Sequence, residues 1–304
     1  MDREAQVTLG RIPRGLAYEY CLRISVYNTD RSVLAEIRKG WGGALISSPS
    51  RDPRWKPSYA LIWTNAAAAR FLAEISPYLR VKSRQAAVLH QFVHHLQKCR
   101  RRRDRLGHLL PLTSRQLEKR EGFYQRIKAL NRRGSTGHEQ QPRTLAPWKN
   151  PLTISPKYLA GFIDAEGCLR LAKGHHPGWN PQYAPRVQVG NTNRAILEDL
   201  RKSFGGILTY HPRRVPGWKD GYQLLWTGRA VTPLLLAVRP FLQIKARQAR
   251  ILLQFIGHRK RTHQRRLGRG FVRLPAGVIA YREALFLRMR KLNAKGPSGS
   301  NGWH

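Results

Sequence analysis

The sequence predicts an α+β protein built from two tandem copies of one domain. Residues 28–43 align with residues 191–206 at an offset of 163, and eight of the sixteen positions are identical. The same offset aligns residues 77–93 with residues 240–256, with nine of seventeen identical. In both copies, short alternating segments and segments of helical period follow one another in the same order. We therefore expect two pseudosymmetric αββαββα domains, each with a twisted antiparallel sheet.

The domain boundaries follow from the repeat and from composition. Residues 128–134 match residues 290–296 at an offset of 162, so both copies end with the same motif. The stretch between the copies is polar, contains proline and lacks periodicity, which is typical of a linker. The predicted organisation is a first copy over 1–134, a linker over 135–150, a second copy over 151–296 and a loose tail over 297–304.

The first helix of the second copy is predicted to run from Ser155 to Glu166. The Ser155 hydroxyl can accept a hydrogen bond from an unpaired backbone N–H, and Pro156 is favoured at the first helical position. Gly167 is typical of a left-handed stop at a helix C-terminus. The strand-like segment 168–171 follows at once.

The remaining elements of the second copy are predicted from period and turn residues. Two short alternating segments flank a polar loop, which indicates a hairpin, and either Thr192 or Asn193 can cap the helix that follows. The predicted elements are a hairpin of 168–171 with 186–189, a helix over 194–203 ending at Gly205 and Gly206, a second hairpin within 207–227, and helices near 231–238, 246–260 and 276–293.

The charge of the chain indicates a polyanionic partner. The sequence has 56 Lys and Arg against 17 Asp and Glu, a formal net charge of +39. Self-repulsion of this size favours nucleic acid as the partner over an anionic membrane surface. The basic residues occur throughout the chain among apolar and aromatic residues, so we expect a basic folded body and not a disordered basic tail.

The cysteines and the hydropathy pattern predict an intracellular protein that does not span a membrane. Cys21, Cys99 and Cys168 have no metal-binding spacing and no evident pairing, which favours a reducing compartment. No stretch approaches eighteen apolar residues, and the first residues lack a secretory signal. The compartment stays open between an organelle (chloroplast or mitochondrion) and the bacterial cytoplasm.

Two acids stand where a helix disfavours them. Asp164 and Glu166 lie in the predicted last turn, where the helix dipole opposes carboxylates by about 0.3–1 kcal/mol each. Two such helix ends could gather oxygen ligands for Mg²⁺ and thereby support phosphodiester hydrolysis. The alternative is an amphipathic core helix whose acids only reach solvent.

The segment Leu159–Gly167, L-A-G-F-I-D-A-E-G, resembles the signature of the LAGLIDADG homing endonucleases. It departs from that signature by Phe at the fourth position and Glu at the eighth. The resemblance implies that Gly161 and Ala165 allow close packing of two signature helices. It further implies a site-specific double-stranded DNA endonuclease that uses Mg²⁺ or another divalent cation, acts as a pseudosymmetric monomer and cuts at a long site.

The resemblance assigns the metal to the eighth signature residue. That residue is Glu166, with Glu4 as its match in the first copy, whereas Asp164 is expected to be a structural or capping acid. Because Met1–Ala5 falls on Ile163–Gly167, most of the first signature helix is expected to be absent from this sequence. The first explanation is a reading frame that begins too late or is fused to an upstream exon, and the next is a degenerate, inactive copy. A true absence would leave room for rescue by a dimer.

The resemblance also assigns two repeated pairs to the active site. Lys82 and Lys245 match the basic residue that lies beside the scissile phosphate, where a cation can stabilise developing charge. Asn28 and Asn191 match a polar residue that orders active-site water. The alternatives are solvated lysines and asparagines that cap a helix or form a turn.

The resemblance places a sheet from each copy in the major groove of DNA. Strand alternation sends every second side chain to one face, and Arg and Gln pair well with guanine and adenine there. The predicted base-facing residues are Arg170, Arg186 and Gln188 in the second copy and Thr8, Arg23 and Ser25 in the first. The basic loop residues predicted to contact phosphates or flanking bases are Arg51, Arg54, Lys56, Arg213, Arg214 and Lys219.

Two other functions fit the same charge. One is a nucleic-acid-binding protein without nuclease activity, either an intron maturase with intron RNA as partner or an inactive DNA-binding remnant. The expected absence of the first signature helix favours this alternative. The other is a ribosome-associated basic protein, which would show neither sequence preference nor metal dependence.

Overall fold

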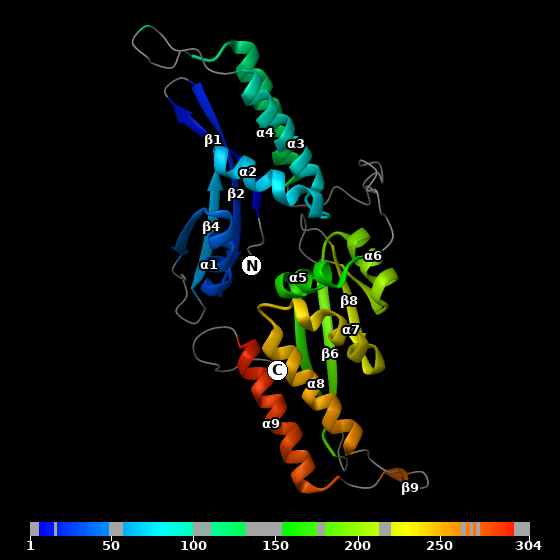
Figure 1. The fold of residues 1–304 in the computed structure, drawn as a ribbon. Coiled ribbons are helices and arrows are strands. Elements are labelled where there is room, and N and C mark those ends of the chain that lie inside the picture. Colours follow the sequence, from blue (N-terminus) through cyan, green and yellow to red (C-terminus); the bar gives the residue numbers. More distant parts are fainter. Residues whose placement is uncertain are drawn as a thin grey trace. The chain divides into compact units, whose positions relative to one another are not determined.

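The computed structural model describes residues 6–14, 17–48, 57–99, 105, 111–131, 154–174, 180–212, 220–262, 266–267, 270–271 and 274–294. The described elements form two compact units, which we call unit 1 (β1 to α4) and unit 2 (α5 to α9) (Figure 1). The α+β class is confirmed, since each unit contains a four-stranded antiparallel sheet with helices packed against it. The predicted linker 135–150 and tail 297–304 lie outside the described residues.

Unit 1 has the sheet order β1-β2-β4-β3, with every neighbouring pair antiparallel. Its last two helices, α3 and α4, pack side by side (Figure 1). The bounds are β1 Gln6–Arg14, β2 Ala17–Asn28, α1 Arg31–Trp41, β3 Ala44–Ser48, β4 Ser58–Thr64, α2 Asn65–Ile75, α3 Ser83–Lys98 and α4 Ser114–Leu130.

Unit 2 repeats this topology with the sheet order β5-β6-β8-β7. After its second hairpin each unit has three described helices where the αββαββα order has one, and β6 is longer than the predicted strand 186–189. The bounds are α5 Pro156–Glu166, β5 Gly167–Gly174, β6 Gln182–Asn191, α6 Arg194–Phe204, β7 Ile207–His211, β8 Gly221–Thr227, α7 Val231–Val238, α8 Ala246–Arg261, β9 Arg266–Leu267, β10 Gly270–Phe271 and α9 Ala276–Asn293.

A buried tryptophan lies at the same place in both cores. Trp63 in β4 is 1% exposed and Trp226 in β8 is 0% exposed. A buried indole N–H needs an acceptor, and these donate to the carbonyl oxygens of Trp41 at 2.8 Å and Phe204 at 3.0 Å. The sequence repeat is thus a repeat of packing and of hydrogen bonding.

The glycine pair after α6 is needed for this packing. Gly206 has a φ of +101°, and a Cβ at this residue would lie 3.0 Å from the Trp226 Nε1. Its match Gly43 has a φ of +99°, and a Cβ there would lie 2.9 Å from the Trp63 Nε1. Both the backbone conformation and the contact with the indole therefore favour glycine.

The left-handed stop predicted at Gly167 is wrong. Its backbone is extended, with φ −84° and ψ 157°, and β5 begins at this residue. A Cβ at Gly167 would lie 2.5 Å from the carbonyl oxygen of Ile163. Glycine is required here because the chain turns directly from helix into strand against the last helical turn.

The last helix of each unit ends in an asparagine that holds the first strand. Asn131 Nδ2 donates to the carbonyl oxygen of Val7 at 3.0 Å, and Asn293 Nδ2 donates to that of Leu169 at 2.8 Å. These pairs explain why the L-N motif recurs at the end of both copies.

A second polar bridge joins the same helices to the first hairpins. In each unit a tyrosine hydroxyl donates to a glutamate, and a basic residue of the hairpin pairs with that glutamate. The hydrogen bond from the tyrosine is the main cause that holds the pKa of Glu121 below its usual value. The matched residues are Tyr20, Glu121 and Arg11, whose ion pair spans 3.1 Å, and Tyr183, Glu283 and Lys173, whose ion pair spans 2.8 Å.

Candidate active site and nucleic-acid interface

The signature segment forms α5 as predicted. The Ser155 Oγ accepts a hydrogen bond from the Tyr158 N–H at 3.2 Å, and Pro156 occupies the first turn. Leu159 and Ile163 are fully buried in unit 2, and they anchor one face of the helix. The helix ends at Glu166, which is half-buried.

Asp164 and Lys245 form a reciprocal clamp at the end of this helix. The Asp164 carboxylate accepts from two backbone N–H groups, that of Gln243 at 2.7 Å and that of Lys245 at 2.9 Å. In return, Lys245 Nζ donates to the carbonyl oxygens of Ile163 at 2.7 Å and Asp164 at 2.6 Å. Four hydrogen bonds thus tie the C-terminus of α5 to the segment that precedes α8.

The clamp explains why the helix tolerates its acids. The C-terminal carbonyls carry the negative end of the dipole, and the Lys245 ammonium offsets it by direct contact. Both oxygens of Asp164 are used by backbone amides, which is the structural role expected for this residue. Of the two signature acids, Glu166 is therefore the candidate ligand for a metal.

The structure brings two predicted site residues to one helix end, because Lys245 contacts the backbone two and three residues before Glu166. In unit 1, Lys82 precedes α3 as Lys245 precedes α8, with φ and ψ of −107° and 20° against −100° and 16°. Glu4 lies outside the described residues.

The predicted asparagines form turns. The Oδ1 atoms of Asn28 and Asn191 accept from the N–H groups of Asp30 and Asn193, each at 2.8 Å. Asp30 and Asn193 then cap α1 and α6, so Asn193 and not Thr192 is the cap. The turn interpretation is confirmed, and the role of Asn28 and Asn191 in ordering water stays a prediction.

The sheet residues of unit 2 lie on the face predicted for them. Leu169, Leu171, Val187 and Val189 are buried in the core, and the residues between them point to the opposite face. The alternating set comprises Arg170, Arg186 and Gln188, and Arg170 is paired with Arg186 across the β5–β6 ladder.

The sheet of unit 1 bears out the predicted face but not the exposure of every residue. Thr8 is paired with Arg23, and Arg23 is exposed. Ser25 is only 2% exposed, and Arg23 Nε donates to its Oγ at 3.4 Å. The expectation that Ser25 reaches a base is therefore wrong for the structure as it stands, because neighbouring side chains cover it.

Sequence reasoning missed polar residues on β7 and β8 of unit 2. Gln223 in β8 and Thr209 in β7 are paired with each other and lie on the same face as Gln188. The signal was available, since Gln223 precedes the buried Leu224 in an alternating strand. The basic loop residues Arg51, Arg54, Lys56, Arg213, Arg214 and Lys219 lie outside the described residues.

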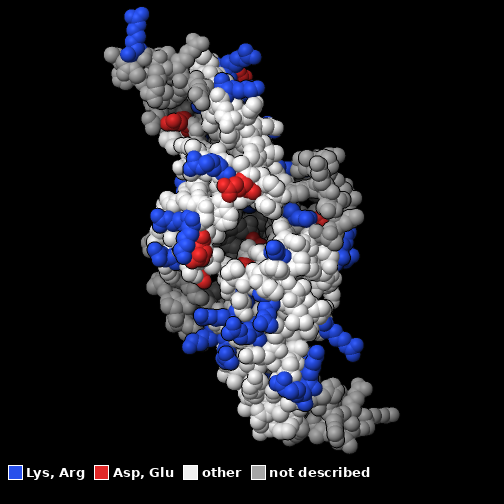
Figure 2. Space-filling view, in the orientation of Figure 1, with Lys and Arg blue, Asp and Glu red and all other residues white. Residues whose placement is uncertain are grey.

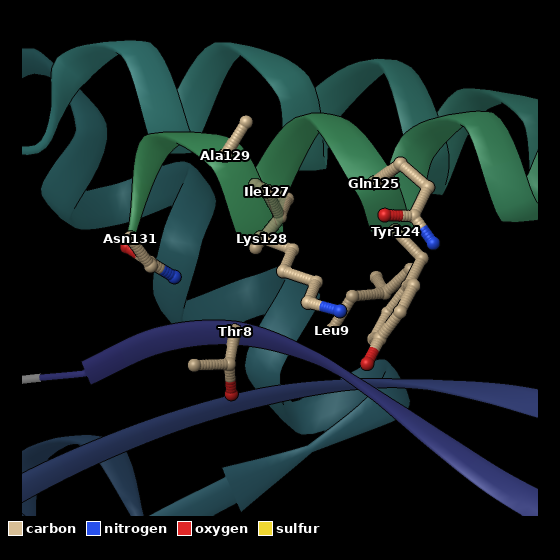
Figure 3. Close-up of a pocket in the computed structure, with 8 residues that line it drawn as sticks. All are labelled: Thr8, Leu9, Tyr124, Gln125, Ile127, Lys128, Ala129 and Asn131. Carbon is tan, nitrogen blue, oxygen red and sulfur yellow. The ribbon is translucent and has the colours of Figure 1, made fainter. Parts of the chain in front are cut away.

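A pocket in unit 1 lies apart from the predicted active-site residues. It is lined by the start of β1 and the C-terminal half of α4, and Figure 3 shows Lys128 reaching from the helix toward Leu9. Thr8 and Asn131 also line it. It holds no carboxylate, so it does not offer the ligands of a divalent cation.

Glu166 is suited to bind a cation whose other ligands are water and the phosphate oxygens of a substrate. Within the described residues, no group of three or more His, Cys, Asp or Glu could hold a metal by itself. Mg²⁺ commonly takes one or two carboxylates and completes its shell with water and phosphate oxygens. A single carboxylate at a helix end fits that donor set. Across the same residues, no helix has the length and apolarity to cross a membrane.

Comparisons with known proteins identify the fold. No protein-family model matches the chain, and no curated protein matches it in sequence. Solved structures do match, over 94–95% of the chain. They include I-SmaMI bound to an uncleaved DNA target with calcium (15% identity, 95% of each chain, TM-score 0.66), I-LtrWI bound to target DNA (14%, 94% of each, 0.66) and I-GzeII in complex with its DNA target (13%, 94% of each, 0.63).

TM-scores of 0.63–0.66 establish a shared fold, and at identities of 13–15% they establish the fold alone. The alignment covers nearly the whole of each chain and therefore includes both units. The resemblance of Leu159–Gly167 predicted this fold and its two units. The chain has the two-domain fold of the LAGLIDADG homing endonucleases.

Proposed function

We propose that this protein is a site-specific endonuclease that cleaves double-stranded DNA with a divalent cation. Three observations support the proposal: the fold, the signature at Leu159–Gly167 and the net charge of +39. Lys and Arg predominate over Asp and Glu on the visible face in Figure 2, as expected for a protein that binds a polyanion. In the proposal each unit binds one half of a long target.

Glu166 would hold Mg²⁺, with Glu4 as its counterpart from the first copy. A bound Mg²⁺ polarises a phosphoryl oxygen and lowers the pKa of a coordinated water. Lys245 keeps the end of α5 in place through Ile163 and Asp164, and its charge favours the anionic transition state. Asn191 would orient the attacking water, with Lys82 and Asn28 in the matching positions of unit 1.

The clamp between Asp164 and Lys245 is the observation on which the active-site assignment depends. Positioning a reacting group is worth several kcal/mol only if its support is rigid. Here the helix end that carries Glu166 is held by four hydrogen bonds of 2.6–2.9 Å. A carboxylate supported in this way suits a metal ligand better than a solvated side chain.

The cysteines fit an intracellular site of action. Cys21, Cys99 and Cys168 are all unpaired, as expected in a reducing compartment. The proposal therefore includes an organelle or a bacterial cytoplasm as the location.

The test is cleavage of a plasmid pool that carries long randomised inserts, with and without Mg²⁺. The native chain is expected to linearise a subset of plasmids that share a sequence, and only with the metal. Glu166→Gln should abolish cleavage and preserve binding. Glu198→Gln is the matched control, because Glu198 forms a surface ion pair with Arg194 at 2.8 Å in the same unit.

Binding without cleavage by any form would contradict the nuclease and favour a binding protein. Competition with structured intron RNA would then separate a maturase from a DNA-binding remnant. Cleavage that survives Glu166→Gln would contradict the role of Glu166.

A further inference from the structure

The open sheet faces of the two units differ at matched positions. Each sheet buries one face in its own core and leaves the other available to a ligand. The ladders place five residues of unit 2 on that face, and the offset of 162 or 163 gives their matches in unit 1. The pairs are Arg170 with Thr8, Arg186 with Arg23, Gln188 with Ser25, Gln223 with Ala60, and Thr209 with Ile46.

Three of the matched residues of unit 1, which are Ser25, Ala60 and Ile46, offer little hydrogen bonding to a ligand. Ser25 is 2% exposed and Ala60 is 5% exposed, whereas Gln188 and Gln223 are partly exposed. Ile46 is 49% exposed and presents a branched aliphatic side chain to the ligand side. The two faces therefore differ in chemistry as well as in sequence.

The one arginine that both faces share is used differently. Arg23 Nε donates to Ser25 Oγ at 3.4 Å, so part of this guanidinium is engaged within the fold. Arg186 Nε is buried and has no hydrogen-bond partner among the residues that the structure describes. Arg186 also lies opposite Arg170, which concentrates positive charge at one row of the sheet.

The different side chains on the two faces would discriminate between bases in the major groove to different extents. Arg pairs bidentately with guanine and Gln pairs bidentately with adenine, whereas an aliphatic side chain contacts only the methyl group of thymine. A face with two Arg and two Gln can therefore discriminate at several base pairs. Among the described residues, the unit 1 face has the exposed Gln6, the partly engaged Arg23 and the exposed Ile46, and it discriminates at fewer base pairs.

We propose that the two halves of the DNA target are read unequally. This inference rests on the proposed function. Unit 2 reads its half strictly, through hydrogen bonds from Arg170, Arg186, Gln188 and Gln223 to purines. Unit 1 reads its half less strictly, through Gln6 and Arg23 and through apolar contact of Ile46 with thymine methyl groups.

The experiment is selection of bound DNA from a randomised double-stranded library without divalent metal, so that binding is separated from cleavage. Base preference is expected to concentrate in one half of the recovered sites. Gln188→Ser combined with Gln223→Ala, which gives unit 2 the residues of unit 1, should weaken discrimination in that half by about 5- to 150-fold at each contacted base pair. Thr8→Ala combined with Ile46→Ala is the matched control and should leave that half unchanged.

A second measurement tests the half of the DNA target that unit 1 is proposed to read. Replacing thymine by uracil in a recovered site removes only the methyl group. Binding should weaken when the substitution lies in the loosely read half, and Ile46→Ala should remove this dependence on the methyl group. Melting temperatures of all variants serve as the check on folding.

Equal preference in both halves would overturn the inference and leave the proposed function standing. Preference concentrated in the half that responds to Thr8→Ala with Ile46→Ala would overturn it as well. Failure to select any DNA sequence would contradict the proposed function itself, and the inference would fall with it.

Discussion

The inner and outer faces of the two sheets have diverged to very different extents. On the inner faces, Trp63 and Trp226 are both buried and both donate to a backbone carbonyl. Asn131 and Asn293 hold the first strands in the same way. These contacts recur because a close-packed core tolerates few changes of volume or polarity.

On the open faces most residues at matched positions differ in size or charge, and Arg23 with Arg186 is the exception. Arg170 stands where unit 1 has Thr8, and Gln223 stands where it has Ala60. The backbone ladders are nevertheless the same. Packing constraints preserved the fold in both copies, while the residues of the open faces were free to vary with the ligand.

The largest expected effect tests whether the cores are equivalent. Trp226→Ala and Trp63→Ala should each lower the free energy of unfolding of their own unit by about 3–5 kcal/mol, because each leaves a large cavity. The measurement is denaturant unfolding followed by a probe in each unit, since two domains need not unfold together. Effects that differ by more than twofold would contradict the equivalence.

The next effect concerns the clamp, which the structure describes in unit 2. Lys245→Met removes an ammonium group from two carbonyl oxygens and should cost about 1.5–3 kcal/mol of unfolding free energy. Lys202→Met in the last turn of α6 is the control, because Lys202 is exposed. A loss no greater than that of the control would show that the clamp does not stabilise α5.

A smaller effect is expected at the asparagines that hold the first strands. Asn293→Ala and Asn131→Ala should each cost about 1 kcal/mol, because each removes one hydrogen bond to a backbone carbonyl. Amide hydrogen exchange in β5 and β1 would localise the loss. If hydrogen exchange changes in only one of the two strands, the two asparagines do not have the same role in the two units.

The smallest expected effect is a pH dependence of the free energy of unfolding, caused by His95 in unit 1 and His258 in unit 2. Burial lowers the pKa of His95, and the charges of Arg120 and Lys119 lower it further. Burial also lowers the pKa of His258, and the charge of Arg282 lowers it further. A lowered pKa means that the folded state prefers the neutral ring. Stability is therefore complete above the unfolded pKa of about 6.5 and is lost as pH falls toward the folded value.

Thermal unfolding between about pH 7 and pH 5 measures this loss, because that window lies above the carboxyl range. The variant His95→Gln with His258→Gln should flatten the profile. A slope that the double variant leaves unchanged would assign the pH dependence to other groups.

Local signals in the sequence predicted the elements well. Ser155 and Pro156 begin α5 as expected, because a cap and a proline act within one turn. Strand alternation placed Arg170 and Arg186 on the correct face, because side chains alternate strictly along a strand. Local signals failed at Gly167, where a contact and not a turn requires glycine.

The duplication, the order of the elements and the face on which each strand residue lies were all predictable from the sequence, because repeats, caps and alternation are properties of neighbouring residues. The contacts of Asp164 and Lys245 at the end of α5 and the burial of Ser25 became visible in the folded chain. The Asp164–Lys245 hydrogen bond joins residues 81 positions apart, and no local pattern encodes such a contact.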